Sequence, residues 1–401
     1  MVGQSGLFLL VLALYSNTQW VYSAQTCLKT YQNMTIDGGI FKTISGNLST
    51  CCTSCQQTSG CVAYSWDGVN TCWLQNQTQP LYMHSNRTTV IMSPLPSAAY
   101  SLNQTYSAGN FFGTNGKNNF HFITWGLTNV TKNVNQATAN SSGLIAYQNG
   151  QVYIGVDHTN VVTTGRPTTQ LQSLWLYNSG LFILNLAHMP SGNTTWPSWW
   201  FQGPNWPNNG EIDVLEGVYG MNYNLISLHT GNNCTVQQNY STYFNGTWAN
   251  SGSNKGCSIK APKGTFQDAF NAAGGGVFAL QWDRNNYIRV WNFINPNIPD
   301  DIKNNSTNPN PDTWGIPNAY IPLDSNCSPS HFNNLSMTFD IAFCGSWAAQ
   351  YVSGGEAACE NVLKNDPSQF SEAYWLINYV KVFGKPGDSL GTYYPTCQFA
   401  C

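Results

Sequence analysis

Three carboxylic acids stand close together in a chain that has few of them. Only 18 of the 401 residues are Asp or Glu, yet Glu211, Asp213 and Glu216 fall within one hexapeptide, Glu-Ile-Asp-Val-Leu-Glu. Side chains of a β-strand alternate between two faces, so Glu211 and Asp213 share a face. Glu216 would point the other way unless the strand contains a one-residue bulge near Val214 and Leu215. The sequence therefore predicts a bulged strand with all three carboxylates on one face.

Like charges on one face of a strand repel each other, so the cluster is costly unless protons are retained or a cation is bound. Two carboxyl groups about 5 Å apart fit a retaining glycosidase, in which one attacks the anomeric carbon and the other protonates the leaving oxygen. Burial and neighbouring negative charge would keep that acid protonated near neutral pH. For the hexapeptide alone, a solvated acidic edge strand and a calcium site remain as alternatives.

Four tryptophans precede the carboxylates at positions 196, 199, 200 and 206, and Asn208 and Asn209 follow them. Sugar rings present C–H faces that stack on indoles, while amide side chains bond the hydroxyls. The mixture is typical of a carbohydrate cleft. Aromatic side chains also fill cores, so Trp199 or Trp200 could instead belong to the interior of the domain.

The elements that must position these groups are short strands. From about residue 98 onward, runs rich in Val, Ile, Tyr, Phe and Trp recur between Gly, Asn and Pro turns, for example 152–156, 180–186, 277–282, 287–293 and 375–383. Many short strands with little helix favour a β-sandwich or jelly roll. Asp283–Asn286 is expected to be a hairpin turn, and Glu356–Leu363 a helix.

Several motifs in order carry a family resemblance. His188–Pro190 (HMP), Trp206–Gly217 (WPNNGEIDVLEG) and Leu228–Cys234 (LHTGNNC) resemble glycoside hydrolase family 16, in particular the fungal-type laminarinase-like endo-1,3(4)-β-glucanases. The resemblance runs from about residue 100 to 383. It implies an all-β, concanavalin-like jelly-roll sandwich with an open cleft, a retaining mechanism and no cofactor.

The resemblance also implies roles for individual residues. Glu211 becomes the nucleophile, Glu216 the general acid/base and Asp213 the assisting carboxylate between them. The implied substrate-binding residues are Trp196, Trp206, His229, Arg166 and Trp347.

The chain departs from the family pattern at the expected subsites. Gln170 and Gln172 stand where similar fungal sequences often alternate two arginines, and Ser346 stands where an Asp is common. The catalytic trio is intact. The preference between β-1,3 and mixed β-1,3/1,4 linkages stays open.

The cysteines divide the chain. Six of the 13 lie between Cys27 and Cys72, where a short segment needs covalent staples. We expect a disulfide module at 25–90, a linker at 91–98, the catalytic domain at 99–386 and a tail at 387–401. The Cys52–Cys55 spacing also fits a redox or zinc site, but structural disulfides are favoured. The module resembles apple or PAN modules, which implies binding to a cell-surface glycan or protein.

The N-terminal segment and the glycosylation sequons indicate where the protein is located. Residues 1–24 contain an apolar run too short to span a bilayer and are expected to be a signal peptide, so the mature protein is secreted and extracellular. Recurrent Asn-x-Ser/Thr sequons, including Asn140, indicate glycosylation. Fifteen Lys and Arg residues form no basic stripe for nucleic acid, and no later segment reaches membrane length.

These observations predict a monomeric, secreted, retaining endo-glycosidase whose partner is β-glucan. One rival is a transglycosylase, because transfer to a sugar uses the same two carboxylates. The other is a non-catalytic glucan-recognition protein on the same fold. In such a protein the acid or the nucleophile is expected to be replaced, and here Glu211 and Glu216 both remain.

Overall fold

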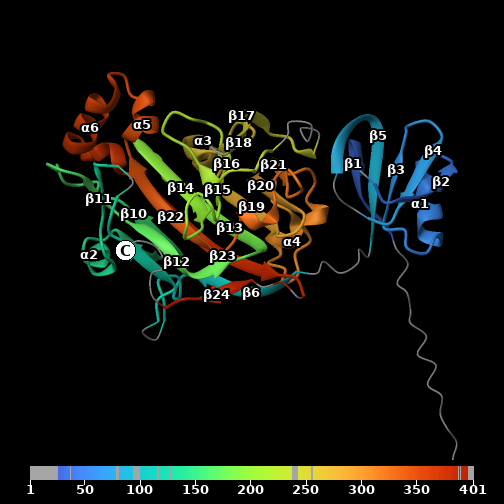
Figure 1. Cartoon of the computed structure of the whole chain (residues 1–401), viewed down its shortest axis with the longest axis horizontal. Helices are drawn as coiled ribbons and strands as arrows, with labels where there is room; N and C mark the ends of the chain where they lie inside the picture. Colours follow the sequence, from blue (N-terminus) through green and yellow to red (C-terminus); the bar gives the residue numbers. More distant parts are fainter. Residues whose placement is uncertain are drawn as a thin grey trace, which may run out of the picture.

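The computed structural model describes residues 26–395 except 37, 78–80, 94–99, 115–116, 127, 237–242, 254–255, 387 and 389. The predicted signal peptide, most of the predicted linker and residues 396–401 of the predicted tail lie outside this part. Figure 1 shows a large β-rich domain, with a smaller unit drawn in blue beside it. Within the described residues, no helix has the length and apolar character needed to cross a bilayer.

The large domain is built from two antiparallel sheets. In the described residues, the 8-stranded sheet has the order β21 (Ala319–Pro322), β20 (Tyr287–Ile294), β19 (Gly276–Asp283), β13 (Gly180–His188), β23 (Tyr374–Gly384), β10 (Gln151–Gly155) and β9 (Ile145–Gln148), with β6 (Ser101–Ser107) paired to β23. The 9-stranded sheet has the order β17 (Thr247–Ser253), β18 (Gly256–Lys260), β16 (Leu225–His229), β15 (Glu211–Glu216), β14 (Thr195–Gln202), β22 (Leu335–Phe343), β12 (Gln170–Tyr177) and β24 (Gly391–Tyr393), with β7 (Phe120–Ile123) paired to β12.

Smaller elements surround the sandwich. The strands β8 (Thr131–Asn133) and β11 (Arg166–Thr168) form a short parallel pair. The helices are α2 (Gln136–Ser141), α3 (Gln267–Ala272), α4 (Asp300–Lys303), α5 (Gly345–Ala348) and α6 (Gly355–Asn365). The predicted strands, the 283–286 hairpin turn and the helix near 356–363 are all confirmed.

Aromatic side chains fill the space between the two sheets. Phe182 of β13 meets Phe201 of β14 edge to face at 4.8 Å, and Trp375 of β23 meets Phe339 of β22 at 5.8 Å. All four are almost fully buried. Such pairs add to the burial of apolar area that stabilises the sandwich. The predicted all-β jelly-roll class is confirmed.

Strand β22 shows why the 9-stranded sheet has two different faces. Its sequence, Leu-Ser-Met-Thr-Phe-Asp-Ile-Ala-Phe, alternates apolar and mostly small or polar residues. Leu335, Met337 and Phe339 point into the core, so Ser336 and Thr338 lie on the opposite face, the one that carries the carboxylates of β15. The sequence pattern thus gives the sheet one apolar and one polar face.

The domain limits differ from the expected ones at two places. Strand β5 (Leu81–Ser93) continues three residues past the predicted end of the module. Strand β24 lies inside the predicted tail, but Tyr393 pairs with Trp175 of β12, so residues 391–393 belong to the sheet.

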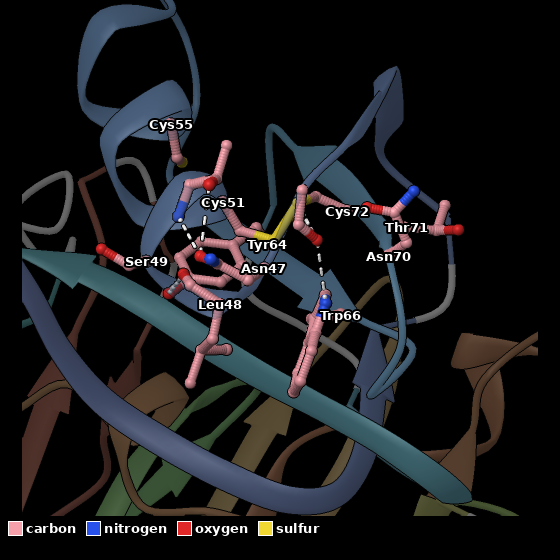
Figure 2. Close-up of a disulfide and its surroundings, with 12 residues drawn as sticks. Asn47, Leu48, Ser49, Cys51, Cys55, Tyr64, Trp66, Asn70, Thr71 and Cys72 are labelled. Atoms are coloured by element: carbon pink, nitrogen blue, oxygen red, sulfur yellow. Dashed lines mark hydrogen bonds between the residues drawn. A yellow bond between two sulfur atoms is a disulfide. The ribbon is translucent and has the colours of Figure 1, made fainter.

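The N-terminal unit is a five-stranded antiparallel sheet with one helix packed on it. The strand order is β1 (Thr26–Ile36), β5, β3 (Ala63–Trp66), β4 (Thr71–Gln75) and β2 (Ile40–Ser45), and the helix is α1 (Leu48–Gln57). The Asn47 side chain accepts a hydrogen bond from the backbone N–H of Thr50 at 3.0 Å and caps this helix. Figure 2 shows the Cys51–Cys72 disulfide, which ties α1 to β4.

Disulfides connect all six cysteines of the unit. Besides Cys51–Cys72, the pairs are Cys27–Cys52 and Cys55–Cys61, so Cys52 and Cys55 are structural and do not pair with each other. The large domain adds Cys234–Cys327 and Cys344–Cys359. Among the described cysteines, Cys257 is a buried free thiol, which accounts for one unpaired residue of the odd total.

The unit also contacts the large domain. The Tyr31 hydroxyl donates a hydrogen bond to the Thr313 carbonyl at 2.7 Å, and the rings of Tyr82 and Tyr243 stack with centroids 5.5 Å apart. Ile316 packs against the apolar cluster under β1 and β5. These contacts come in addition to the connecting segment.

Candidate active site

A β-bulge brings the three carboxylates together, as the sequence predicts. Along the antiparallel pair of β14 and β15, Trp199 lies opposite Leu215 while its neighbour Trp200 lies opposite Asp213. Val214 is therefore the extra residue. The bulge reverses the facing of the residues after it, so Glu216 joins Glu211 and Asp213 on one face.

Asn224 satisfies the backbone groups that the bulge leaves unpaired. Its side-chain N–H donates to the Val214 carbonyl at 2.7 Å, and its side-chain oxygen accepts from the Glu216 N–H at 2.8 Å. Asn224 is fully buried, and its own N–H donates to the Thr265 hydroxyl at 2.9 Å. Because unpaired buried backbone groups are costly, this clamp fixes the direction in which Glu216 leaves the strand.

Each carboxylate has a different partner. The Trp206 indole N–H donates to Glu211, and the Trp196 indole N–H donates to Glu216 at 2.9 Å. Asp213 is only 2% exposed, and its carboxylate lies 3.4 Å from Nε2 of His229. His229 in turn stands directly opposite Glu211 in the pairing of β15 with β16. The environments are unequal, so the three groups are suited to different tasks.

Burial raises the pKa of all three carboxyl groups. For Glu211 the charge of Asp213 raises the pKa further, while His229 and the Trp206 hydrogen bond favour the ionised form. For Asp213 the charge of Glu216 adds to burial. The pKa of Glu216 is raised to about 7, although the Trp196 hydrogen bond lowers it. The cluster therefore retains protons near neutral pH, and Glu216 is placed to give one up and take it back.

The calcium alternative does not suit the donor set. Glu211, Asp213 and His229 bring one ligand atom each within 4.8 Å of one another. Calcium takes six to eight oxygen ligands, whereas this group offers two carboxylates and an imidazole. The contacts with Trp206 and between Asp213 and His229 account for the geometry without an ion.

Tryptophans gather around the carboxylates. Trp206 is 56% exposed beside Glu211. Trp196 and Trp347 meet edge to face at 5.4 Å on the Glu216 side. Together with His229, these are four of the five predicted substrate-binding residues, and the structure brings them to one place.

Arg166 is the fifth predicted substrate-binding residue. It lies elsewhere, so its predicted role must be corrected. Its guanidinium is fully buried and donates to the carbonyls of Leu363 and Asp157, the first through Nε at 2.9 Å and the second at 2.6 Å. It also stacks over Phe370, with 4.4 Å to the ring centroid. The side chain holds α6 and the loop after β10 together, so we leave it out of the substrate-binding set.

The two remaining tryptophans divide between the faces. Trp199 is fully buried in the core, as one alternative foresaw. Trp200 stands opposite Asp213 and Thr338 on the carboxylate face, and it is 6% exposed. Their opposite orientations follow from the strand period of two.

A fourth carboxyl group, Asp340, was missed by the sequence analysis. Ser198 lies opposite both Glu216 and Asp340, so the three side chains form a row across the sheet. Asp340 is 3% exposed, and its carboxyl oxygens make no hydrogen bond of good geometry. Burial, followed by the charge of Glu216, raises its pKa and favours the neutral acid, although the Trp200 indole and the Ser198 backbone lie close enough to lower the pKa slightly. The alternation of β22 could have indicated it, because Asp340 continues the polar series of Ser336 and Thr338.

Comparison with known proteins gives the same picture. Residues 127–383 match the XgeA-like, catalytic GH16 domain. The chain belongs to glycoside hydrolase family 16. Among its relatives, an endo-1,3(4)-beta-glucanase of Arthroderma benhamiae is 34% identical over 73% of this chain and 66% of its own length. A probable glycosidase of Schizosaccharomyces pombe is 37% identical over 71% of this chain and 69% of its own length.

The chain matches only part of several relatives. For a probable endo-1,3(4)-beta-glucanase of Aspergillus niger, 33% identical, the match spans 41% of the relative. Two solved structures of family 16 are similar over 71% of this chain. Laminarinase 16A of Phanerochaete chrysosporium, with 6-O-glucosyl-laminaritriose in its donor and acceptor sites, is 31% identical with a TM-score of 0.66 over 99% of that chain. An elongating beta-1,3-glucosyltransferase is 30% identical with a TM-score of 0.64 over 100% of that chain.

Proposed function

We propose that this protein is a secreted, retaining endo-glycosidase that hydrolyses internal β-1,3 or mixed β-1,3/1,4 linkages of β-glucan. The observation that carries the proposal is the bulged strand β15, which directs Glu211, Asp213 and Glu216 onto one face, beside the exposed Trp206 and the half-buried Trp196 and Trp347. The relatives named as endo-1,3(4)-beta-glucanases support the choice of substrate. The disulfides of the described chain fit an oxidising, extracellular compartment.

In the first step, ionised Glu211 attacks the anomeric carbon and a C–O bond to the enzyme forms. The bond to the leaving sugar breaks as Glu216 transfers its proton to the leaving oxygen. The Trp206 hydrogen bond holds the Glu211 oxygen in place. The Trp196 hydrogen bond does the same for Glu216. No cofactor takes part in this proposed chemistry.

In the second step, Glu216 is ionised and accepts a proton from water. The water oxygen attacks the anomeric carbon and displaces Glu211, so the product has the configuration of the substrate. A pKa of about 7 for Glu216 suits both directions of proton transfer near neutral pH. Asp213 is buried between Glu211 and Glu216 and contacts His229. In this proposal it influences the charges of both glutamates as they change during the reaction.

The test is to incubate the purified full-length protein with laminarin and to measure new reducing ends. We expect a mixture of oligosaccharides of intermediate length from the start, as an endo-acting enzyme produces. The result that would reject the proposal is the absence of new reducing ends from folded protein. The same assay on a mixed β-1,3/1,4-glucan measures the linkage preference.

Transglycosylation is the second candidate, because a similar structure is an elongating beta-1,3-glucosyltransferase. Both reactions share the glycosyl-enzyme and differ in what attacks it. Mass spectrometry of products formed with an added oligosaccharide acceptor distinguishes them. Products longer than the donor would identify transfer, whereas shorter products alone would identify hydrolysis.

Asn224→Ala is expected to lower turnover on laminarin by about 10- to 100-fold. The substitution leaves the Val214 carbonyl and the Glu216 N–H without partners, so the bulge relaxes and the acid is misdirected. The Michaelis constant should change little, because the tryptophans are untouched. Asn178→Ala is the matched control, since Asn178 also makes two amide hydrogen bonds, both to Asn334, away from the site. Equal turnover in the two folded variants would rule out the clamp.

The N-terminal unit is, in our proposal, an apple-like binding module for insoluble glucan or another cell-surface glycan or protein. Its sheet, helix and three internal disulfides make a compact unit of its own. Deleting residues 25–93 should leave turnover on short soluble oligosaccharides within about twofold and weaken binding to insoluble glucan. Because Tyr31 and Tyr82 contact the large domain, thermal melting must first confirm folding of the truncated protein. Loss of turnover on the short substrate would show instead that the module completes the catalytic domain.

A further inference from the structure

A second surface of the large domain has the lining of a carbohydrate site. A cavity of about 390 Å³ opens where β12 and β24 meet the segment before β7. Its lining residues are Trp175, Tyr393, Asn118, Asn119, Thr114 and Lys117. Aromatic rings and side-chain amides therefore stand together again, outside the catalytic strand.

The aromatic part of this surface is held rigidly. Trp175 of β12 and Tyr393 of β24 are direct partners in the antiparallel pairing. Their ring centroids are 5.7 Å apart with an interplanar angle of 55°, and both side chains are half-buried. The Tyr393 hydroxyl donates to the Asn118 carbonyl at 3.3 Å. A fixed platform binds a ring at a lower entropy cost than a mobile side chain does.

A second cavity continues the surface. It measures about 540 Å³ and shares Thr114, Lys117 and Asn118 with the first. Tyr147, which is 43% exposed, and Gln136 extend the lining. Both volumes fall in the range of roughly 300 to 1,000 Å³ that is usual for ligand sites. Among the described residues that line the two cavities, Lys117 is the only charged one, so the surface suits a neutral polyhydroxy ligand rather than an ionic one.

The surface is separate from the catalytic carboxylates. In the 9-stranded sheet, β14, β22 and β12 lie between β15 and β24. Four steps of about 4.8 Å give a lateral offset of roughly 19 Å, and Trp175 lies on the other face of the sheet, because its neighbour Leu176 is the residue that shares the carboxylate face with Ser336. A polymer of many sugar units can reach both, whereas a short oligosaccharide cannot.

We propose that the furrow between Trp175–Tyr393 and Tyr147 is a second, non-catalytic binding site for a β-glucan chain. The inference rests on the proposed function, which supplies the ligand. A chain held there raises the effective concentration of its neighbouring segments at the cleft. The benefit applies to long or insoluble substrates and not to short ones.

The test compares Tyr393→Ala with Tyr393→Phe in the full-length protein. Tyr393→Phe keeps the ring and is the matched control. Each protein is tested with its glycans and again after enzymatic deglycosylation, because Asn140 begins an Asn-x-Ser sequon and lines the second cavity. Binding is measured by the retardation of each protein in gels that contain laminarin. All proteins in this assay also carry the Glu211→Gln substitution, which prevents turnover. We expect about three- to tenfold weaker binding for Tyr393→Ala and a change within twofold for Tyr393→Phe.

The same pair is assayed for turnover with Glu211 intact. Tyr393→Ala should turn over insoluble β-1,3-glucan more slowly and a four-sugar oligosaccharide at the parental rate. If Tyr393→Ala fails to fold, Asn118→Ala replaces it, with an expected loss of about two- to fivefold in laminarin binding. If a folded Tyr393→Ala or Asn118→Ala variant binds laminarin as tightly as the protein without that substitution, the second site is overturned. The proposed function is unaffected by that result as long as the wild type cleaves laminarin. Failure of the wild type to cleave laminarin overturns the proposed function itself.

Discussion

Glu211→Gln is expected to lower turnover on laminarin on the order of 10³-fold or more, which corresponds to about 4 kcal/mol of activation free energy. The amide keeps the size of the side chain but cannot form the covalent glycosyl-enzyme. Binding of oligosaccharide should persist, because the tryptophans beside the site are unchanged. The measurement is release of reducing ends by protein whose melting temperature matches the wild type.

Glu372→Gln is the matched control for this variant. Glu372 is also a glutamate with a hydrogen-bonded partner, His188 at 3.1 Å, but its side chain is 62% exposed and lies outside the carboxylate cluster. We expect turnover within about twofold of the wild type. If Glu211→Gln hydrolysed laminarin as fast as this control, another group would have to be the nucleophile.

Glu216→Gln is expected to lower turnover on laminarin by about 10²- to 10⁴-fold, the usual contribution of a general acid. An aryl glycoside with a good leaving group needs no protonation, so the variant should still form the glycosyl-enzyme from it. The second step then lacks its base. A rapid burst of released phenol followed by a slow phase is therefore expected, whereas Glu211→Gln should give no burst.

The pH profile adds a second readout for Glu216. Burial raises its pKa from 4.5 to about 7, so the proton needed for the first step is lost as the pH rises through that value. For the wild type, the rate on laminarin should fall on the alkaline side of about pH 7. In Glu216→Gln the burst on the aryl glycoside should no longer show this fall. If the rate of the variant still fell on the alkaline side as in the wild type, a residue other than Glu216 would have to be the group that titrates.

The strand period was sufficient to predict the bulge. With carboxylates at offsets of two and five, no regular strand could present all three on one face, and the structure has its extra residue at Val214. The hydrogen bonds from Asn224 to the bulge could not be predicted from the local sequence. Asn224 lies eight residues beyond Glu216, and its role depends on a turn of the chain that returns it to the bulge. Nothing in the spacing of an Asn indicates such a return.

Both errors concern the tertiary surroundings of a residue, which a local sequence pattern does not show. Arg166 belongs to a recognisable motif, but a motif does not state whether a guanidinium faces solvent or, as here, the carbonyls of Asp157 and Leu363. Asp340 was overlooked because it is the lone acidic residue of its strand and lies 124 residues beyond Glu216. Its neighbourhood arises from strand order, with β14 between β15 and β22. Strand order is a tertiary property, so local patterns predicted the elements better than their arrangement.

The most direct test of the central claim, that Glu211 and Glu216 act by double displacement, is the anomeric configuration of the first product. Laminari-oligosaccharide is mixed with a high concentration of enzyme, and the anomeric protons are followed by NMR from the first minute. We predict that the β-anomer appears first and that the α-anomer grows in later, at the rate of spontaneous mutarotation. Initial appearance of the α-anomer would contradict the account, because a single displacement by water inverts the configuration and forms no covalent bond to Glu211.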